Sequence, residues 1–287
     1  MDFERVGVVG CGLMGSGIAE VCARAGVNVV VREADEALLR AGRDRVAQSL
    51  ARAVRAGKLT DDERDVALER MTFRSDWDAL GDRQLVVEAV TEDATAKLAV
   101  YRELDRVVAA NDAILASNTS SIPIMKLAMA TSRPAQVIGI HFFNPVPVLR
   151  LVELITSLLT SEEAAARAEA FVTTRLGKRV IRSQDRAGFV VNALLIPYLL
   201  SAIRMFESGF ASRDDIDSGM IEGCAHPMGP LALADLIGLD TTMAVAVSLY
   251  EEFKEPLYAP PPLLSRMVEA NLLGRKTGRG FYEYPAR

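Results

Sequence analysis

The sequence predicts an α/β protein of two domains: a doubly wound, mainly parallel sheet comes first, and a smaller all-helical domain follows it. Short apolar runs alternate with helical stretches, as in parallel sheets that are covered by helices on both faces. These runs lie at residues 6–9, 27–31, 85–89, 114–117 and 137–141. After Val180 and Ile181 the strand pattern ends and helical periodicity takes over. We therefore expect a first domain over residues 1–187 and a second over residues 188–287, since a chain of 287 residues is long enough for two domains.

Composition and charge narrow the classes of function. A net charge of −5 argues against nucleic-acid binding, which needs a basic surface. No apolar run approaches the roughly 18 residues that a membrane-spanning helix requires, and the N-terminus lacks the basic start and apolar run of a secretory signal. Three cysteines without CxxC spacing and only two histidines indicate free thiols and no metal site. We expect a cytoplasmic protein that binds neither membranes nor nucleic acids.

An insertion separates the second and third predicted strands. Residues 34–57 carry apolar side chains at near-helical spacing, and Thr60-Asp61-Asp62-Glu63 is typical of a capping box that begins another helix. We expect a helical hairpin that stands off the sheet. Its bases outnumber its acids between residues 40 and 58, where Asp44 is accompanied by Arg40, Arg43, Arg45, Arg52, Arg55 and Lys58. Such runs usually form a solvated face, and an anion site is the alternative interpretation.

The first predicted strand runs directly into a glycine-rich motif. Gly10-Cys11-Gly12-Leu13-Met14-Gly15 matches G-x-G-x-x-G and lies between a predicted strand and a predicted helix, which is the context that the motif requires. The glycines permit a tight turn and let a pyrophosphate approach the free N–H groups at the positive end of the helix. We therefore expect a Rossmann-type dinucleotide site on this loop, with contacts from Gly10, Gly12, Leu13, Met14 and Gly15. A flavin site and a methyltransferase loop are the alternatives.

An acidic residue at the end of the second predicted strand indicates which dinucleotide binds. Glu33 lies about 20 residues beyond the glycines, where a carboxylate accepts the hydroxyls of the adenosine ribose. The same carboxylate repels the 2′-phosphate of NADP, so the sequence favours NAD as the cofactor. Arg32 is adjacent, and its positive charge would weaken that repulsion.

Several further motifs resemble those of the 3-hydroxyacyl-CoA dehydrogenase family. They are Ala116-Ser117-Asn118-Thr119-Ser120-Ser121, His141-Phe142-Phe143-Asn144-Pro145-Val146-Pro147 with Leu151-Val152-Glu153, Gly188-Phe189-Val190-Val191-Asn192, Pro227-Met228-Gly229-Pro230 and Lys276-Thr277-Gly278-Arg279-Gly280-Phe281-Tyr282. These motifs are long, ordered and spread over essentially the whole chain. Within the family the chain is most similar to the bacterial 3-hydroxybutyryl-CoA dehydrogenases. The resemblance implies reversible, NAD-dependent hydride transfer between a short-chain L-3-hydroxyacyl-CoA and its 3-ketoacyl partner.

The resemblance also implies the catalytic residues, and the chemistry of the side chains agrees with it. Oxidation of a secondary alcohol needs a base near neutral pH, and His141 lies at the C-terminal end of a predicted strand, where ligands of open α/β sheets bind. By resemblance, Glu153 orients and stabilises the imidazole, Ser120 hydrogen-bonds the C3 oxygen of the substrate, and Asn192 adds a contact from the second domain. His226 is interpreted as a loop-capping residue rather than as a second acid or base.

Further contacts are carried over from the family. Residues implied near the ribose and nicotinamide of the cofactor are Glu92, Lys97, Asn144 and Lys276. Ser49 matches the family's CoA-contacting serine, whereas Ala56 stands near the position of its lysine. Basic side chains of the hairpin are therefore expected to bind the CoA phosphates instead, namely Arg52, Arg55 or Lys58. The family further implies an acyl-CoA substrate, such as acetoacetyl-CoA, and a homodimer formed through the helical domain.

Two other functions stay open at the level of sequence. A related hydroxy-acid or sugar-acid dehydrogenase would keep the fold and cofactor but would need no site for the CoA phosphates. A non-catalytic dinucleotide-binding or structural protein would have little reason to retain Ser120, His141, Glu153 and Asn192 together. Departures from the family, such as Ala193 where relatives often have arginine, leave the acyl-chain preference open.

Overall fold

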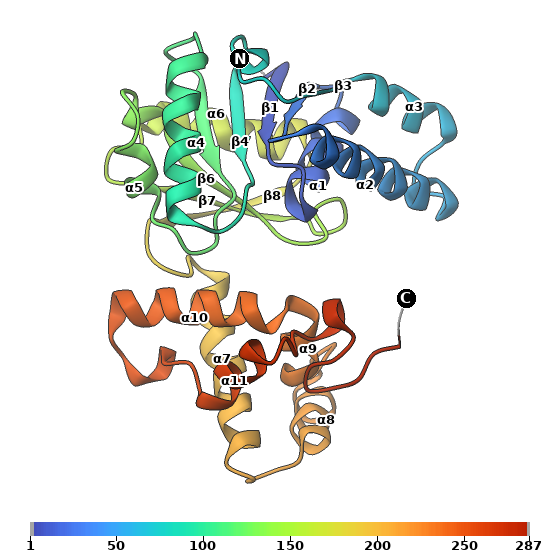
Figure 1. Cartoon of the computed structure of the whole chain (residues 1–287), viewed down its shortest axis with the longest axis vertical. Helices are drawn as coiled ribbons and strands as arrows, with labels where there is room; N and C mark the ends of the chain where they lie inside the picture. The colour runs from blue at the N-terminus through green and yellow to red at the C-terminus, as the bar shows by residue number, and fades with distance from the viewer. Residues whose placement is uncertain (1–2, 286–287) are drawn as a thin grey trace. The chain divides into compact units, whose positions relative to one another are not determined.

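The computed structural model describes residues 3–285, and the chain divides between Arg186 and Ala187 into two compact units. The first unit is an eight-stranded sheet of order β3-β2-β1-β4-β5-β6-β7-β8 with helices on both faces (Figure 1). Its strands are β1 (Arg5–Val9), β2 (Asn28–Arg32), β3 (Met71–Arg74), β4 (Leu85–Glu88), β5 (Ile114–Ser117), β6 (Val137–Phe142), β7 (Leu151–Thr156) and β8 (Arg179–Gln184). Every neighbouring pair is parallel except β6 and β7, which confirms the prediction of a doubly wound, mainly parallel sheet.

Helices join these strands. In the first unit they are α1 (Leu13–Arg24), α2 (Glu36–Arg55), α3 (Asp61–Glu69), α4 (Ala94–Val107), α5 (Ile124–Ala128), α6 (Glu162–Ala170) with a π-helical turn η3 (Phe171–Arg175), and the 3₁₀ turns η1 (Asp78–Leu80) and η2 (Pro134–Gln136). The predicted hairpin is formed by α2 and α3, which extend to one side of the sheet (Figure 1). Both hydrogen bonds of the predicted capping box between Thr60 and Glu63 are present at the start of α3.

Two strands, β3 and β7, do not appear among the apolar runs of the sequence. β3 is a four-residue strand at the edge of the sheet, and exposed Thr72 and Arg74 interrupt its apolar residues. β7 carries Glu153 in the middle of its apolar run. By contrast, β4, β5 and β6 are buried along their whole length, because helices cover both faces of the sheet. Continuous apolar sequence thus identified the central strands and missed these two.

The second unit is helical, as predicted. It consists of α7 (Val191–Glu207), α8 (Arg213–Cys224), α9 (Pro230–Ile237), α10 (Leu239–Phe253), α11 (Pro262–Glu269) and the 3₁₀ turns η4 (Pro256–Tyr258) and η5 (Arg275–Thr277). α11 ends at Glu269, and Asn271, two residues later, adopts a left-handed conformation with φ of +56°. A left-handed residue cannot continue an α-helix.

Two buried aspartates organise the second unit. Asp217 accepts hydrogen bonds from the first-turn N–H groups of Leu231 and Ala232 in α9, at 2.8 and 2.9 Å. Asp235 accepts from the N–H groups of Phe281 and Tyr282 at 3.0 and 2.9 Å. Gly229 of the motif at residues 227–230 and Gly280 of the motif at residues 276–282 make room for these carboxylates. A Cβ at Gly229 would overlap Asp217, and a Cβ at Gly280 would overlap Asp235. These motifs therefore have a structural role.

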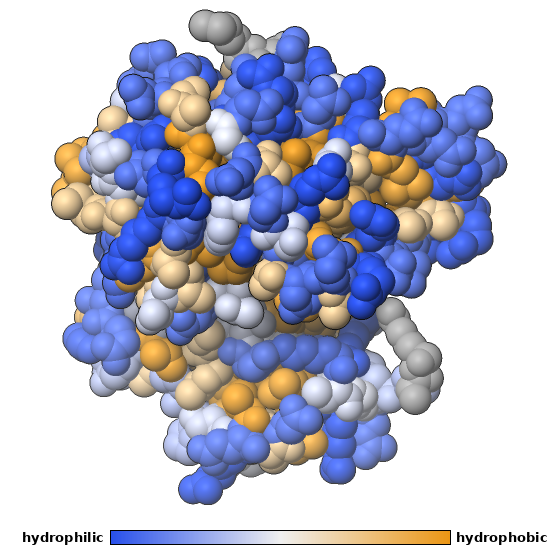
Figure 2. Space-filling model, turned by 45° about the horizontal axis from the view of Figure 1, so that its top comes forward, coloured by the Kyte–Doolittle hydropathy of each residue, from blue (hydrophilic) through white to orange (hydrophobic). Residues whose placement is uncertain are grey.

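The surface has no extended apolar band on the face seen in Figure 2, where hydrophilic side chains predominate and apolar ones form separate patches. Between residues 3 and 285, no single helix is long and apolar enough to span a membrane; only the sharply bent pair α9 and α10, taken together, meets the criteria of length and composition.

Candidate functional site

The loop between β1 and α1 has the backbone that a dinucleotide pyrophosphate requires. Gly10 adopts φ of +90°, which favours glycine. A Cβ at Gly15 would overlap the carbonyl oxygen of Gly10, so the turn can close this tightly only with glycine there. A Cβ at Gly12, the N-cap of α1, would meet nothing within 4 Å. Space is therefore open in front of the free N–H groups of α1, and the loop fits NAD.

Glu33 reaches the glycine loop from the end of β2. Its Oε1 accepts a hydrogen bond from the N–H of Cys11 at 2.5 Å, and its Oε2 accepts from the N–H of Ala34 at 3.1 Å. On the other side, Nη1 of Arg45 in α2 donates to the carbonyl oxygen of Cys11 at 2.6 Å. Burial, followed by the negative charge of Glu33, raises the pKa of the Cys11 thiol to about 12 and keeps it neutral. The loop is thus fixed by a carboxylate and a guanidinium.

The antiparallel pairing of β6 and β7 places His141 directly opposite Glu153. Nδ1 of His141 lies 2.7 Å from Oε2 of Glu153, and the two side chains belong to residues that are 5% and 0% exposed. A carboxylate without access to water needs a donor, which Nδ1–H supplies, and the neutral ring then keeps Nε2 as an acceptor. Nε2 lies 3.0 Å from Oγ of Ser120. The three side chains form one hydrogen-bonded chain.

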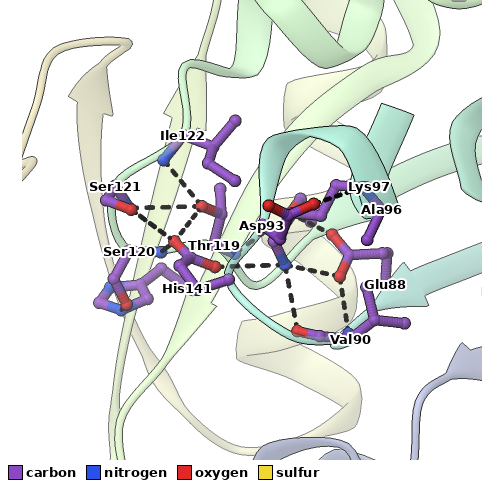
Figure 3. A network of polar contacts seen from close by, with 12 residues as sticks. Glu88, Val90, Asp93, Ala96, Lys97, Thr119, Ser120, Ser121, Ile122 and His141 are labelled. Carbon is purple, nitrogen blue, oxygen red and sulfur yellow. Dashed lines mark hydrogen bonds and ion pairs between the residues drawn. The ribbon is translucent and has the colours of Figure 1, made fainter. Parts of the chain in front are cut away.

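Glu92 holds the loop that carries Ser120. Its Oε1 accepts hydrogen bonds from the N–H groups of Ser120 and Ser121 at 2.8 and 2.9 Å and from Oγ1 of Thr119 at 2.5 Å. Figure 3 shows these three loop residues gathered beside His141. Burial opposes ionisation of Glu92, but the charge of Lys97 and these hydrogen bonds outweigh burial and hold its pKa below the ordinary value of 4.5. At neutral pH an anion therefore fixes the course of the loop.

Lys97 connects Glu92 to a second buried carboxylate. Its Nζ lies 2.6 Å from Oε1 of Glu88 and 3.3 Å from Oε2 of Glu92. Glu88 also accepts from Oγ of Ser117 at 2.7 Å and from the N–H of Val90 at 2.7 Å (Figure 3). Lys97 is only 1% exposed and Glu88 is 0% exposed. Together they join the ends of β4 and β5 to the start of α4.

Comparison with known proteins identifies the chain. Residues 5–186 match the NAD binding domain of 3-hydroxyacyl-CoA dehydrogenase, and residues 188–284 match the C-terminal domain of 3-hydroxyacyl-CoA dehydrogenase. The chain belongs to the 3-hydroxyacyl-CoA dehydrogenase family. It is therefore an NAD-dependent oxidoreductase, and the predicted family, activity class and cofactor are confirmed.

Individual relatives extend the match over the whole chain. The 3-hydroxybutyryl-CoA dehydrogenase of Mycobacterium tuberculosis is 64% identical over 281 residues, which are 98% of this chain and 98% of that protein. The crystal structure of M. tuberculosis FadB2 has a TM-score of 0.98 and 63% identity, covering 99% of this chain and 100% of that one. The crystal structure of (S)-3-hydroxybutyryl-CoA dehydrogenase from Ralstonia eutropha has a TM-score of 0.93 and 47% identity, covering 99% and 100%.

The predicted cofactor residues of the first unit occupy different environments in this dehydrogenase. Leu13 and Met14 lie in the first turn of α1 at the glycine loop, and Asn144 is exposed just after β6. Glu92 lies between β4 and α4 and accepts hydrogen bonds from the Ser120 loop. Lys97 is buried between two carboxylates, so its contacts are those of a residue that supports the loop. Direct contact of these five residues with the cofactor stays a prediction.

Predicted residues of the second unit have partners of their own. Asn192 lies in the first turn of α7. Nζ of Lys276 lies 2.5 Å from both carboxylate oxygens of Asp240. Nδ1 of His226 lies 3.1 Å from the hydroxyl of Tyr198, which agrees with a structural role for this histidine. The roles of Asn192 and Lys276 toward substrate and cofactor stay predictions.

The basic side chains of the hairpin fall into two groups. Arg45 is partly buried and binds the glycine loop, and exposed Arg43 has its guanidinium 5.0 Å from the ring centroid of Phe73. The bases proposed for CoA are exposed at the end of α2 and in the following turn, namely Arg52, Arg55 and Lys58, and Ser49 is partly buried on the same helix. The basic run is therefore neither wholly a solvated face nor wholly an anion site.

Sequence reasoning missed the inner part of the network. Glu88 is the last residue of the otherwise apolar strand β4. This charged residue in a buried strand is the signal in the sequence that could have identified Glu88 as part of the site. Thr119 and Ser117 appeared only as members of a motif. Within residues 3–285, no group of three or more histidine, cysteine or acidic side chains is arranged to hold a metal ion.

We expect Glu92→Gln to destabilise the first unit in a pH-dependent way. The pKa of Glu92 is depressed in the folded protein, so its stabilising effect is complete above the unfolded value near 4.5 and is lost as the pH falls through the lower folded value. The variant should lose about 1–3 kcal/mol of unfolding free energy at pH 7, because a charged acceptor is removed from several donors. Urea unfolding between pH 7 and pH 3.5, followed by the emission of the single tryptophan, measures this difference.

Glu103→Gln is the matched control, since Glu103 lies on the outer side of α4 in an exposed pair with Arg106. It should change the unfolding free energy by less than about 0.5 kcal/mol at any pH. A loss in Glu92→Gln that stays constant down to pH 3.5 would contradict the assignment, because protonation of this carboxyl in the unfolded chain should reduce the difference below the unfolded value near 4.5.

Proposed function

We propose that the protein interconverts a short-chain L-3-hydroxyacyl-CoA, namely (S)-3-hydroxybutyryl-CoA, and its 3-ketoacyl partner acetoacetyl-CoA. The observation that carries the proposal is the chain of hydrogen bonds that runs from the carboxylate of Glu153 through the imidazole of His141 to the hydroxyl of Ser120. We infer the acyl group of the substrate from the similar proteins, which are named as 3-hydroxybutyryl-CoA dehydrogenases. Reduction of acetoacetyl-CoA by NADH, with free acetoacetate as the comparison, tests the proposal. Equal rates with both would favour a hydroxy-acid dehydrogenase.

Three side chains have different roles in the reaction at C3. His141 takes the proton of the C3 hydroxyl through Nε2 and returns it in the reverse direction. Glu153 keeps Nδ1 protonated and stabilises the imidazolium that forms, without itself gaining the proton. Ser120 donates its hydroxyl to the C3 oxygen, where charge develops. Bound NAD⁺ supplies the acceptor for the hydride that leaves C3.

Substrate recognition and assembly are part of the same proposal. Exposed Arg52, Arg55 and Lys58 attract the phosphates of CoA, and Asn192 contributes a polar contact from the second unit. We also infer a homodimer, since the second unit has large apolar side chains in water, among them Leu194 and Phe210, 74% and 80% exposed. The free cysteines fit the reducing cytoplasm.

We expect substitutions in the His141–Glu153 pair to lower turnover without preventing cofactor binding. His141→Ala removes the proton acceptor, so kcat should fall by about 10² to 10⁴ while NADH still binds. Glu153→Gln keeps the shape of the side chain but removes the charge that stabilises imidazolium, so kcat should also fall. Steady-state kinetics and NADH titration measure the two effects.

The double variant decides how Glu153 acts. If the carboxylate works only through the imidazole, the double variant should be little slower than His141→Ala alone. Losses that multiply independently would mean that Glu153 acts directly on the substrate, and the proposed pair would be wrong.

We expect NADH to be preferred over NADPH by tenfold or more in kcat/KM. Glu33 repels a 2′-phosphate, and a tenfold preference corresponds to about 1.4 kcal/mol. Glu33→Ser should narrow the gap, chiefly by improving the value for NADPH. Comparable kcat/KM values for both dinucleotides in the unmodified enzyme would refute this role of Glu33.

We expect the exposed bases of α2 to act on CoA rather than on NAD. The double change Arg52→Glu and Arg55→Glu should raise KM for acetoacetyl-CoA and leave the affinity for NADH nearly unchanged. The matched control is Arg102→Glu with Arg106→Glu, which reverses two exposed charges on α4. Equal shifts of KM in both double variants would mean that only net charge matters, and the hairpin would be a solvated face.

A further inference from the structure

Arg32, the residue before Glu33, is partly buried and is held against the segment that follows β3. Its Nε donates to the carbonyl oxygen of Ser75 at 3.2 Å. Its guanidinium carbon lies 3.8 Å from the ring centroid of Trp77, a close cation–π stack. Both contacts engage the group that would otherwise be available to an anion beside Glu33.

The segment that makes these contacts is itself fixed. β2 and β3 pair with Arg32 opposite Arg74, and the N–H of Glu33 donates to the carbonyl oxygen of Arg74 at 3.1 Å. The carboxylate of Asp76 accepts from the N–H of Ala79 at 2.9 Å and so closes the turn η1. Trp77 is partly buried between these two anchors. The indole is therefore presented to Arg32 by the sheet and the turn together.

The charges around Arg32 favour the same position. Burial lowers the pKa of Arg32, while the carboxylates of Glu33, Glu103 and Asp76 act in the opposite direction and favour its charged form. The guanidinium thus has negative neighbours, a backbone acceptor and an aromatic face without any ligand. The stack and the bond to Ser75 fix where the guanidinium lies, so it could turn toward a phosphate beside Glu33 only by giving up these contacts.

We propose that Trp77 is a specificity-determining residue for the dinucleotide: by stacking on Arg32 it withholds the guanidinium from the 2′-phosphate of NADP, so that Glu33 alone sets the preference. The inference rests on the cofactor site of the proposed function. It explains how an arginine next to Glu33 coexists with selection for NAD. A free guanidinium at that place would bind a phosphate through charge-assisted hydrogen bonds.

Removal of the aromatic face tests the inference. Trp77→Leu should raise kcat/KM for NADPH by about tenfold, which corresponds to about 1.4 kcal/mol, and change the value for NADH by less than about threefold. Trp77→Phe keeps a weaker aromatic face and should lie between the two. The double variant Trp77→Leu with Arg32→Leu should lose the gain, because no guanidinium is left to release. Persistence of the gain in the double variant would overturn the inference.

Arg32→Leu alone gives a second test that does not require Trp77 to be replaced. If the stack withholds the guanidinium, this variant should change the ratio of kcat/KM for NADPH to kcat/KM for NADH by less than about threefold. A large fall in kcat/KM for NADPH would show that Arg32 already reaches the phosphate, and it would overturn the inference. The same variant should shift the fluorescence of Trp77, the single tryptophan of the sequence, because a charge is removed from its ring. Unchanged emission would mean that the stack is absent in solution.

Binding measurements separate this inference from the proposed function. Adenosine 2′,5′-bisphosphate and 5′-AMP differ only in the 2′-phosphate, and their dissociation constants require no turnover. Trp77→Leu should strengthen binding of the bisphosphate relative to 5′-AMP even if acetoacetyl-CoA is not the substrate. An unchanged ratio in an enzyme that reduces acetoacetyl-CoA with NADH would refute the role of Trp77 and leave the proposed function standing.

Discussion

The hydrogen bond between His141 and Glu153 is the interaction on which the site depends, because it joins two polar side chains in the interior of the sheet. A buried carboxylate is costly unless it is hydrogen-bonded, so the pair has to be in register for the fold to tolerate either member. That register comes from the antiparallel pairing of β6 with β7, where the two residues face each other. The one antiparallel pair in the sheet therefore coincides with the place where the proposed chemistry needs two side chains on adjacent strands.

The Ser120 loop depends on a second buried arrangement of charge. Glu88, Lys97 and Glu92 place two carboxylates around one ammonium group, and hydroxyl and N–H donors satisfy the remaining oxygens. Replacement of Lys97 by an apolar residue would leave two carboxylates close together without a cation, which is more damaging than the loss of a surface ion pair. The course of the Ser120 loop is thus determined by β4, α4 and the segment between them, which carry Glu88, Lys97 and Glu92.

The sequence predicts the parts of this protein that are set by continuous patterns. Buried parallel strands appear as apolar runs, the capping box of α3 appears as Thr60 with Glu63, and the glycine motif follows a strand. The apolar pattern does not identify β3, where Thr72 and Arg74 are exposed, or β7, where Glu153 interrupts the apolar residues. The residue types of the site are readable from the sequence, whereas the link from Lys97 through Glu88 to Ser117 is not, because Ser117 reaches Glu88 only through the pairing of β4 with β5.

Basic residues show most clearly what the fold adds to the sequence. Counting charges between Arg40 and Lys58 cannot tell which of them is available to an anion, since availability depends on what each side chain already contacts. Arg45 is engaged by the carbonyl oxygen of Cys11. Arg32 is likewise engaged by Trp77 and Ser75 although it is adjacent to Glu33. An arginine that is fixed in this way supports the backbone or the fold, whereas a guanidinium without such contacts can exchange water for phosphate at lower cost. The same residue type therefore serves the glycine loop, the edge of the sheet and the exposed end of α2, and its partners decide among these roles.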